Sequence, residues 1–155
     1  MARYTPEEAS LLALAAHEVA HAVACKAAAR TRAGRLTVLR AVLQGDRGYI
    51  EHSDVDPDNQ DQVNTALIVL LAGREGGARW VQRNAGMWRG QAMRWSAHGC
   101  SSDLAEFRRM KRFSDRSPGW LEGRARSVVA AHWGRIDRLA HKLADAGRLS
   151  GGHFN

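Results

Sequence analysis

The chain has 155 residues, of which 45% are hydrophobic, and this length and composition exclude a disordered chain and predict a single domain over residues 1–155. Its formal net charge is +7, and residues 74–155 carry 16 of the 23 basic side chains. The arginines are scattered rather than clustered, so we do not expect a nucleic-acid-binding protein.

The first predicted element is a long helix near the N-terminus. Thr5 is a good N-cap, Pro6 suits the first helical position, and Glu8 completes a capping box. The alanine-rich stretch that follows consists mostly of strong helix formers. We expect this helix to continue to about residues 31–34.

A short β-ribbon and a second helix are predicted next. Residues 35–43 are rich in β-branched and apolar side chains, the turn-like stretch QGDRG follows, and residues 49–52 complete the ribbon. Asp56 and Pro57 then begin a helix whose apolar positions keep helical spacing to about Gln82.

The second half of the chain is predicted to contain one long loop and two more helices. Residues 84–101 show no clear period, which predicts a loop. A short helix over 103–113 follows, and then a long last helix from Ser117 to Gly147. Together the elements predict a mainly α fold, a compact bundle of about four to six helices with one small β-ribbon.

The stretch AAHEVAHAV, residues 15–23, places two histidines one helical turn apart. His17 and His21 can therefore bind one ion, and neutral imidazole is a good ligand for Zn²⁺. Glu18 can reach a water molecule on the metal without being a ligand, and can act as the general base. Because two histidines and a glutamate on the face of an apolar helix need partners, we favour a zinc site over a structural accident.

A catalytic zinc needs a third protein ligand. The metzincin pattern would require glycine at position 24 and histidine at position 27, where this chain has alanines, so that class is excluded. Spacing leaves four candidates for the third ligand open, namely Glu75, His98, Cys100 and Asp103.

Several segments, in the same order, resemble the peptidase domain of FtsH-type proteases over about residues 8–154. AAHEVAHAV resembles the zinc helix of that family, LTVLRAVLQGDRGYI resembles its β-ribbon, and IVLLAGREGGARWV resembles the helix that follows. The segment GCSSDLAEFRRM resembles the family's Gly-Ala-Ser-Asn-Asp segment, whose aspartate is a zinc ligand. The resemblance implies a mainly helical zinc peptidase in which His17, His21 and Asp103 bind the metal and Glu18 is the base.

The chain also departs from that family. Arg74 is followed by Glu75-Gly76-Gly77-Ala78 where the family usually continues Ala-Ala-Glu-Glu, so Glu75 is a candidate replacement, from a shifted position, for the acidic support of the site. No P-loop sequence occurs. We therefore expect an ATP-independent zinc metallopeptidase that cleaves flexible or unfolded protein segments. A catalytically silent zinc-binding module and a basic nucleic-acid-associated protein are the alternatives.

The sequence shows no targeting signal. Its N-terminus lacks the basic start and cleavage site of a signal peptide, and no apolar run reaches the ~18 residues that span a bilayer. The two cysteines form no CxxC pair. We therefore expect a cytoplasmic protein with reduced thiols and no membrane span.

Overall fold

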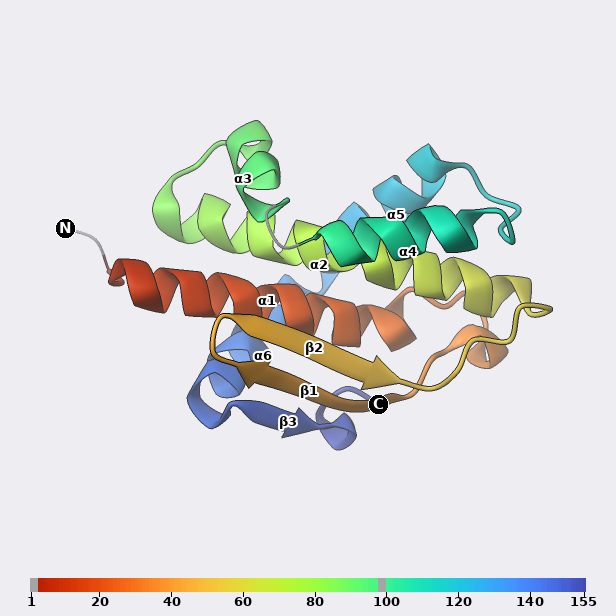
Figure 1. Cartoon of the computed structure of the whole chain (residues 1–155), viewed down its shortest axis with the longest axis horizontal. Helices are drawn as coiled ribbons and strands as arrows, with labels where there is room; N and C mark the ends of the chain where they lie inside the picture. Colours follow the sequence, from red (N-terminus) through yellow and green to blue (C-terminus); the bar gives the residue numbers. More distant parts are fainter. Residues whose placement is uncertain (1–2, 98–99) are drawn as a thin grey trace.

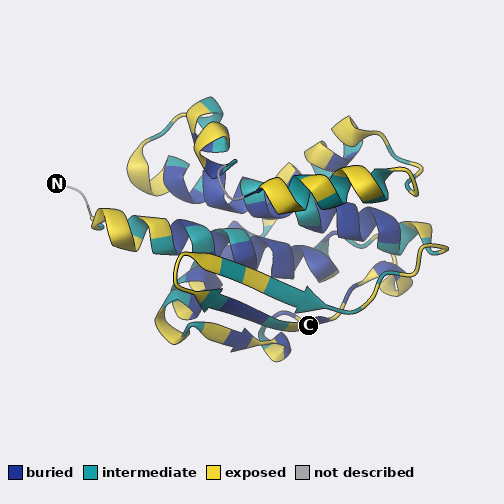
Figure 2. Ribbon diagram, in the orientation of Figure 1, coloured by how far each residue is buried: buried dark blue, intermediate teal, exposed yellow. Residues whose placement is uncertain are grey.

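The computed structural model describes residues 3–97 and 100–155, and over these residues it contains six α-helices and a three-stranded antiparallel sheet. The prediction of a mainly α fold with a small β element is thus confirmed. Two long helices, α1 (Pro6–Ala27) and α2 (Gln60–Ala85), pack side by side at the centre of the molecule (Figure 1) and supply most of its buried residues. Figure 2 shows this buried centre between more exposed outer elements.

The start of α1 follows from its capping box. The Thr5 hydroxyl accepts a hydrogen bond from the Glu8 amide at 3.1 Å, and the Glu8 carboxylate accepts one from the Thr5 amide at 2.8 Å. These contacts satisfy two backbone donors that a helix start leaves free. The helix ends at Ala27, a few residues earlier than predicted, and a short 3-10 turn, Arg32–Gly34, leads to the sheet.

The close packing of α1 against α2 depends on small residues. A Cβ atom added at Gly76 of α2 would lie 2.5 Å from the Cβ atom of Ala20 and 2.7 Å from the carbonyl oxygen of Ala16. Real atoms do not approach this closely, so only glycine at position 76 allows the two helix backbones to pack together. This contact holds the two helices at the separation on which the candidate site depends.

The sheet has the strand order β2-β1-β3. Strands β1 (Val38–Gln44) and β2 (Arg47–His52) form the predicted ribbon, joined by a two-residue turn in which Gly45 has a φ of 60°. The short strand β3 (Arg148–Ser150), which the sequence did not predict, pairs with β1 through Leu149 and Ala41. Strand β2 is therefore an edge strand, and it lies along α1 (Figure 1).

Two features of the second half correct the sequence-based prediction. The segment predicted as a loop contains a helix, α3 (Arg89–Ser96), and the predicted long last helix is two helices, α5 (Pro118–Ala131) and α6 (Trp133–Ala146), which break at His132. The short helix α4 (Ser101–Lys111) lies close to its predicted place and packs on α2 (Figure 1). Within the described part of the chain, no helix has both the length and the apolar character needed to cross a membrane.

Candidate metal centre and cleft

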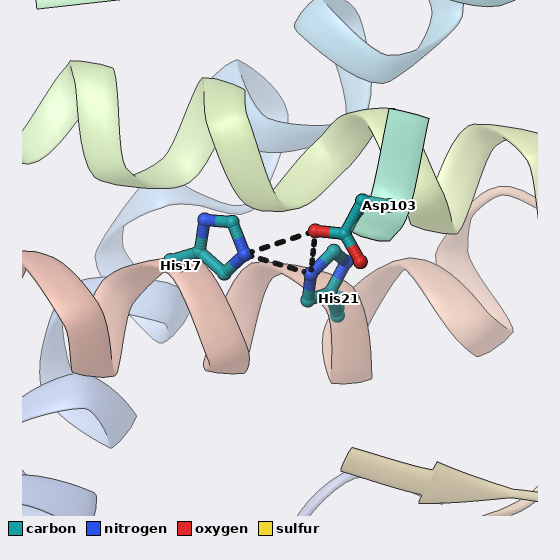
Figure 3. A group of neighbouring side chains, drawn as sticks. All are labelled: His17, His21 and Asp103. Atoms are coloured by element: carbon teal, nitrogen blue, oxygen red, sulfur yellow. Dashed lines mark hydrogen bonds and ion pairs between the residues drawn. The ribbon is translucent and has the colours of Figure 1, made fainter. Parts of the chain in front are cut away.

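Two histidines of α1 and an aspartate that is distant in the sequence meet where α4 approaches α1. His17 and His21 lie one turn apart on α1, and Asp103 lies in the first turn of α4 (Figure 3). The two Nε2 atoms are 3.0 Å apart, and each lies 3.2 Å from Oδ2 of Asp103. The three atoms thus form a nearly equilateral triangle that could hold a metal ion.

The dimensions of this triangle match those of a tetrahedral zinc site. Ligand atoms ~2.0–2.1 Å from a zinc ion, at tetrahedral angles, lie about 3.3 Å from one another. A proton cannot satisfy the same arrangement, because an N–H group points at one acceptor at a time and the triangle has three short sides. The donor set, two imidazoles and one carboxylate, leaves a fourth position for a water molecule, as in catalytic zinc sites.

His21 is held in the orientation that a metal ligand requires. Its ring is buried, with 6% side-chain exposure, and its Nδ1 atom lies 2.6 Å from the carbonyl oxygen of Val69 on α2. A carbonyl can only accept, so Nδ1 carries the proton and donates it. Nε2 is then directed at the triangle and would offer its lone pair to a metal ion, which is how metal-binding histidines are normally fixed.

The charges of the site reinforce one another. Burial alone lowers the pKa of His21, but the hydrogen bond and the charge of Asp103, with smaller contributions from Glu18 and Val69, raise it to about 9. Burial likewise raises the pKa of Asp103, yet contacts with His17 and His21 hold it well below the usual range. In the metal-free protein, a proton on His21 therefore neutralises Asp103, and a metal ion has to displace that proton.

Gly73 of α2 keeps the space beside the histidines open. A Cβ atom at this position would lie 2.4 Å from both Nε2 and Cε1 of His21 and 2.8 Å from Nε2 of His17. Any other residue would place an atom against the Nε2 atoms of both histidines. This glycine lies within the stretch IVLLAGREGGARWV, but only the packing of α1 against α2 shows what it does.

Glu18 lies beside the triangle and is not one of its corners. Its Oε1 atom is 3.9 Å from Nε2 of His17, and the residue is 5% exposed. Among the described residues, its carboxylate accepts no hydrogen bond of standard geometry, so it is free to contact a water molecule at a metal ion held by the triangle. Gly48 on β2 makes room for it, because a Cβ atom there would lie 2.7 Å from Cγ of Glu18.

The triangle opens into a cleft between α1, the edge strand β2 and the start of α4. One part has a volume of about 240 Å³ and contains the three candidate ligands together with Glu18. Its second wall consists of residues of β2, namely Gly48, Tyr49, Ile50 and His52. A wider part of about 640 Å³ continues past His17 and Glu18 toward the turn of the ribbon and the end of α3. The unpaired edge of β2 therefore runs along the cleft.

The remaining sequence candidates lie elsewhere. Both carboxylate oxygens of Glu75 bind the guanidinium of Arg89 on α3, at 2.8 and 2.9 Å, so Glu75 does not contact the metal triangle. The Sγ atom of Cys100 lies 3.9 Å from Nδ1 of His17, on the side of the ring that faces away from the triangle. His98, the remaining candidate, lies outside the described residues.

No protein-family model matches the chain, and no curated protein is significantly similar to it. The structure itself gives a mainly helical fold with a buried group of two histidines and one aspartate that could hold a metal ion.

Proposed function

We propose that this chain is an ATP-independent zinc metallopeptidase of the FtsH type, which hydrolyses peptide bonds in flexible or unfolded protein segments. One observation carries the proposal. The two histidines of the HExxH helix and Asp103, 82 residues further along the chain, meet in a triangle of zinc-ligand size, with the Glu18 carboxylate beside it. The resemblance to FtsH-type proteases named the same four residues.

The cleft supports a peptide substrate. An extended segment can add to the free edge of β2 through main-chain hydrogen bonds, in the way that many domains bind peptides by strand addition. Such binding requires a substrate whose backbone groups are free, which a flexible or unfolded segment supplies and a folded domain does not. Because β2 borders the triangle, the bound backbone would pass directly over it.

The chemistry assigns a distinct role to each residue. Zinc, when bound to His17, His21 and Asp103, supplies a Lewis acid that makes a water molecule acidic near neutral pH. Glu18 accepts a proton from the attacking water, whose oxygen forms the new bond to the peptide carbon. As the carbon–nitrogen bond breaks, Glu18 passes that proton to the leaving amine. The reaction consumes only water, so these steps need no nucleotide.

Cleavage of an unfolded protein by zinc-loaded wild type and Glu18→Gln tests the proposal. Reduced casein is a suitable probe, and Glu7→Gln, an exposed glutamate in the first turn of α1, is the matched control. We expect Glu18→Gln to retain one zinc per chain while its cleavage rate falls by at least ~10²-fold, and we expect Glu7→Gln to behave like wild type. Equal cleavage by Glu18→Gln and wild type refutes the assigned base. A zinc-loaded wild type that cleaves nothing favours a non-catalytic metal-binding module.

A further inference from the structure

We propose that the thiol of Cys100 is the positioning group for His17. It accepts a hydrogen bond from Nδ1–H of the ring and thereby turns the lone pair of Nε2 toward the metal triangle. The inference rests on the metal centre of the proposed function and is independent of whether that centre hydrolyses peptides.

The polarity of the contact follows from where the thiol hydrogen goes. Sγ of Cys100 donates to the carbonyl oxygen of Ser96 at 3.0 Å, so the single S–H donor is already used. Toward His17, 3.9 Å away, the sulfur can therefore only accept, which leaves the proton on Nδ1. The residue is 2% exposed, so water does not compete for these contacts.

The sulfur occupies a place where metal-binding histidines usually have an oxygen acceptor. Glu75 on α2, the candidate acidic support of the site, does not fill this role, because both of its carboxylate oxygens are bound to Arg89. No oxygen acceptor for Nδ1 of His17 is found among the described residues. The two ligands are consequently held differently, since His21 donates to a carbonyl oxygen at 2.6 Å and His17 only to a sulfur at 3.9 Å.

A short series of contacts fixes the sulfur itself. The carbonyl of Ser96, at the end of α3, receives the thiol hydrogen, while the Ser96 hydroxyl donates to the carbonyl of Arg74 on α2 at 2.8 Å. Gly77 makes room for this serine, because a Cβ atom there would lie 2.8 Å from its Oγ atom. The orientation of His17 thus depends on α2 and α3, through Ser96 and Cys100.

The chain supplies a matched control in Cys25. Its sulfur is also buried and also lies near a carbonyl oxygen, that of His21 at 3.5 Å, but it contacts the backbone rather than an imidazole ring. We expect Cys100→Ala to weaken zinc binding by about tenfold, the lower end of the range for partners of metal ligands. Cys25→Ala should leave the zinc dissociation constant within twofold of wild type.

Nuclear magnetic resonance of the zinc-loaded protein provides a readout that a merely structural role would not change. In wild type, the Nδ1 protons of both His17 and His21 should be protected from solvent exchange. Cys100→Ala should lose the protection at His17 and keep it at His21, which remains bound to Val69. Unchanged protection at His17 together with unchanged zinc affinity overturns the proposal, as does an equal loss of affinity in Cys25→Ala.

If Cys100→Ala does not fold, Cys100→Ser decides the question. The hydroxyl can still donate to Ser96 and accept from His17, so the His17 proton should stay protected. Its resonance should shift, because its acceptor changes from sulfur to oxygen. An unshifted resonance shows that residue 100 is not the acceptor and overturns the proposal.

Discussion

Replacing Gly73 with alanine separates the stability of the fold from the integrity of the metal site. The added Cβ atom would lie 2.4 Å from Nε2 of His21, whereas ordinary contacts begin at 3.4 Å, so the atoms have to move apart by about 1 Å. Zinc sites tolerate changes of only about ±0.2 Å in ligand distance. A shift of this size moves at least one histidine out of the triangle, and we expect zinc affinity to fall by at least about tenfold.

The control for this substitution is Gly134→Ala. A Cβ atom at this position, near the start of α6, meets no other atom within 4 Å, so alanine there brings only its higher helix propensity, worth up to about 1 kcal/mol. Competition with a chromophoric chelator measures the affinity of each variant, and thermal unfolding in excess chelator measures the stability of the metal-free fold. If Gly73→Ala binds zinc as tightly as wild type, the ion does not lie between these histidines and the reasoning fails.

Three further predictions concern the charges of the site. Asp103→Asn should weaken zinc binding by at least about tenfold. Glu75→Gln, which only breaks the pair with Arg89, should leave zinc affinity unchanged and lower the melting temperature. A metal titration of both variants that gives the opposite order would assign the third ligand to Glu75. Because the pKa of His21 is raised to about 9 in the metal-free protein, zinc affinity should rise by up to about tenfold per pH unit from pH 7 and level off above pH 9. The same raised pKa stabilises the metal-free fold fully below pH 6.5, the ordinary pKa of histidine, and this stabilisation should be lost as the pH rises through 9. Chemical unfolding in the presence of chelator measures it. A free energy of unfolding that stays constant over this pH range contradicts the raised pKa of His21.

Local patterns predicted the elements whose buried faces repeat regularly. The capping box predicted the start of α1, and the β-branched and apolar residues before a turn-like stretch predicted the ribbon of β1 and β2. Helix α3 was missed because it buries only Ala92 and Ser96, too few residues for a helical stripe. Strand β3 has three residues and one buried side chain, Leu149, which no alternation can reveal.

The break between α5 and α6 was hidden for a different reason. Buried residues Val128 and Ile136 lie on either side of His132 at the spacing of an unbroken helix, and neither glycine nor proline occupies the break itself. At the site, the two histidines followed from spacing along one helix. Asp103 came only from the resemblance, because the meeting of α4 with α1 is a tertiary contact.

Helix α4 carries Asp103, the proposed third ligand, and yet is weakly anchored. None of its eleven residues, all of which the structure describes, is fully buried, and only partly buried side chains such as Phe107 and Met110 rest on the core. Segments with so little buried surface open at low free energy. A metal held by α1 and α4 together would link that local opening to metal concentration, because an ion bound to all three residues stabilises the closed form by mass action. Removing the ion would then release one wall of the cleft while the α1–α2 core stays folded, so amide exchange and proteolytic nicking in α4 would report metal occupancy.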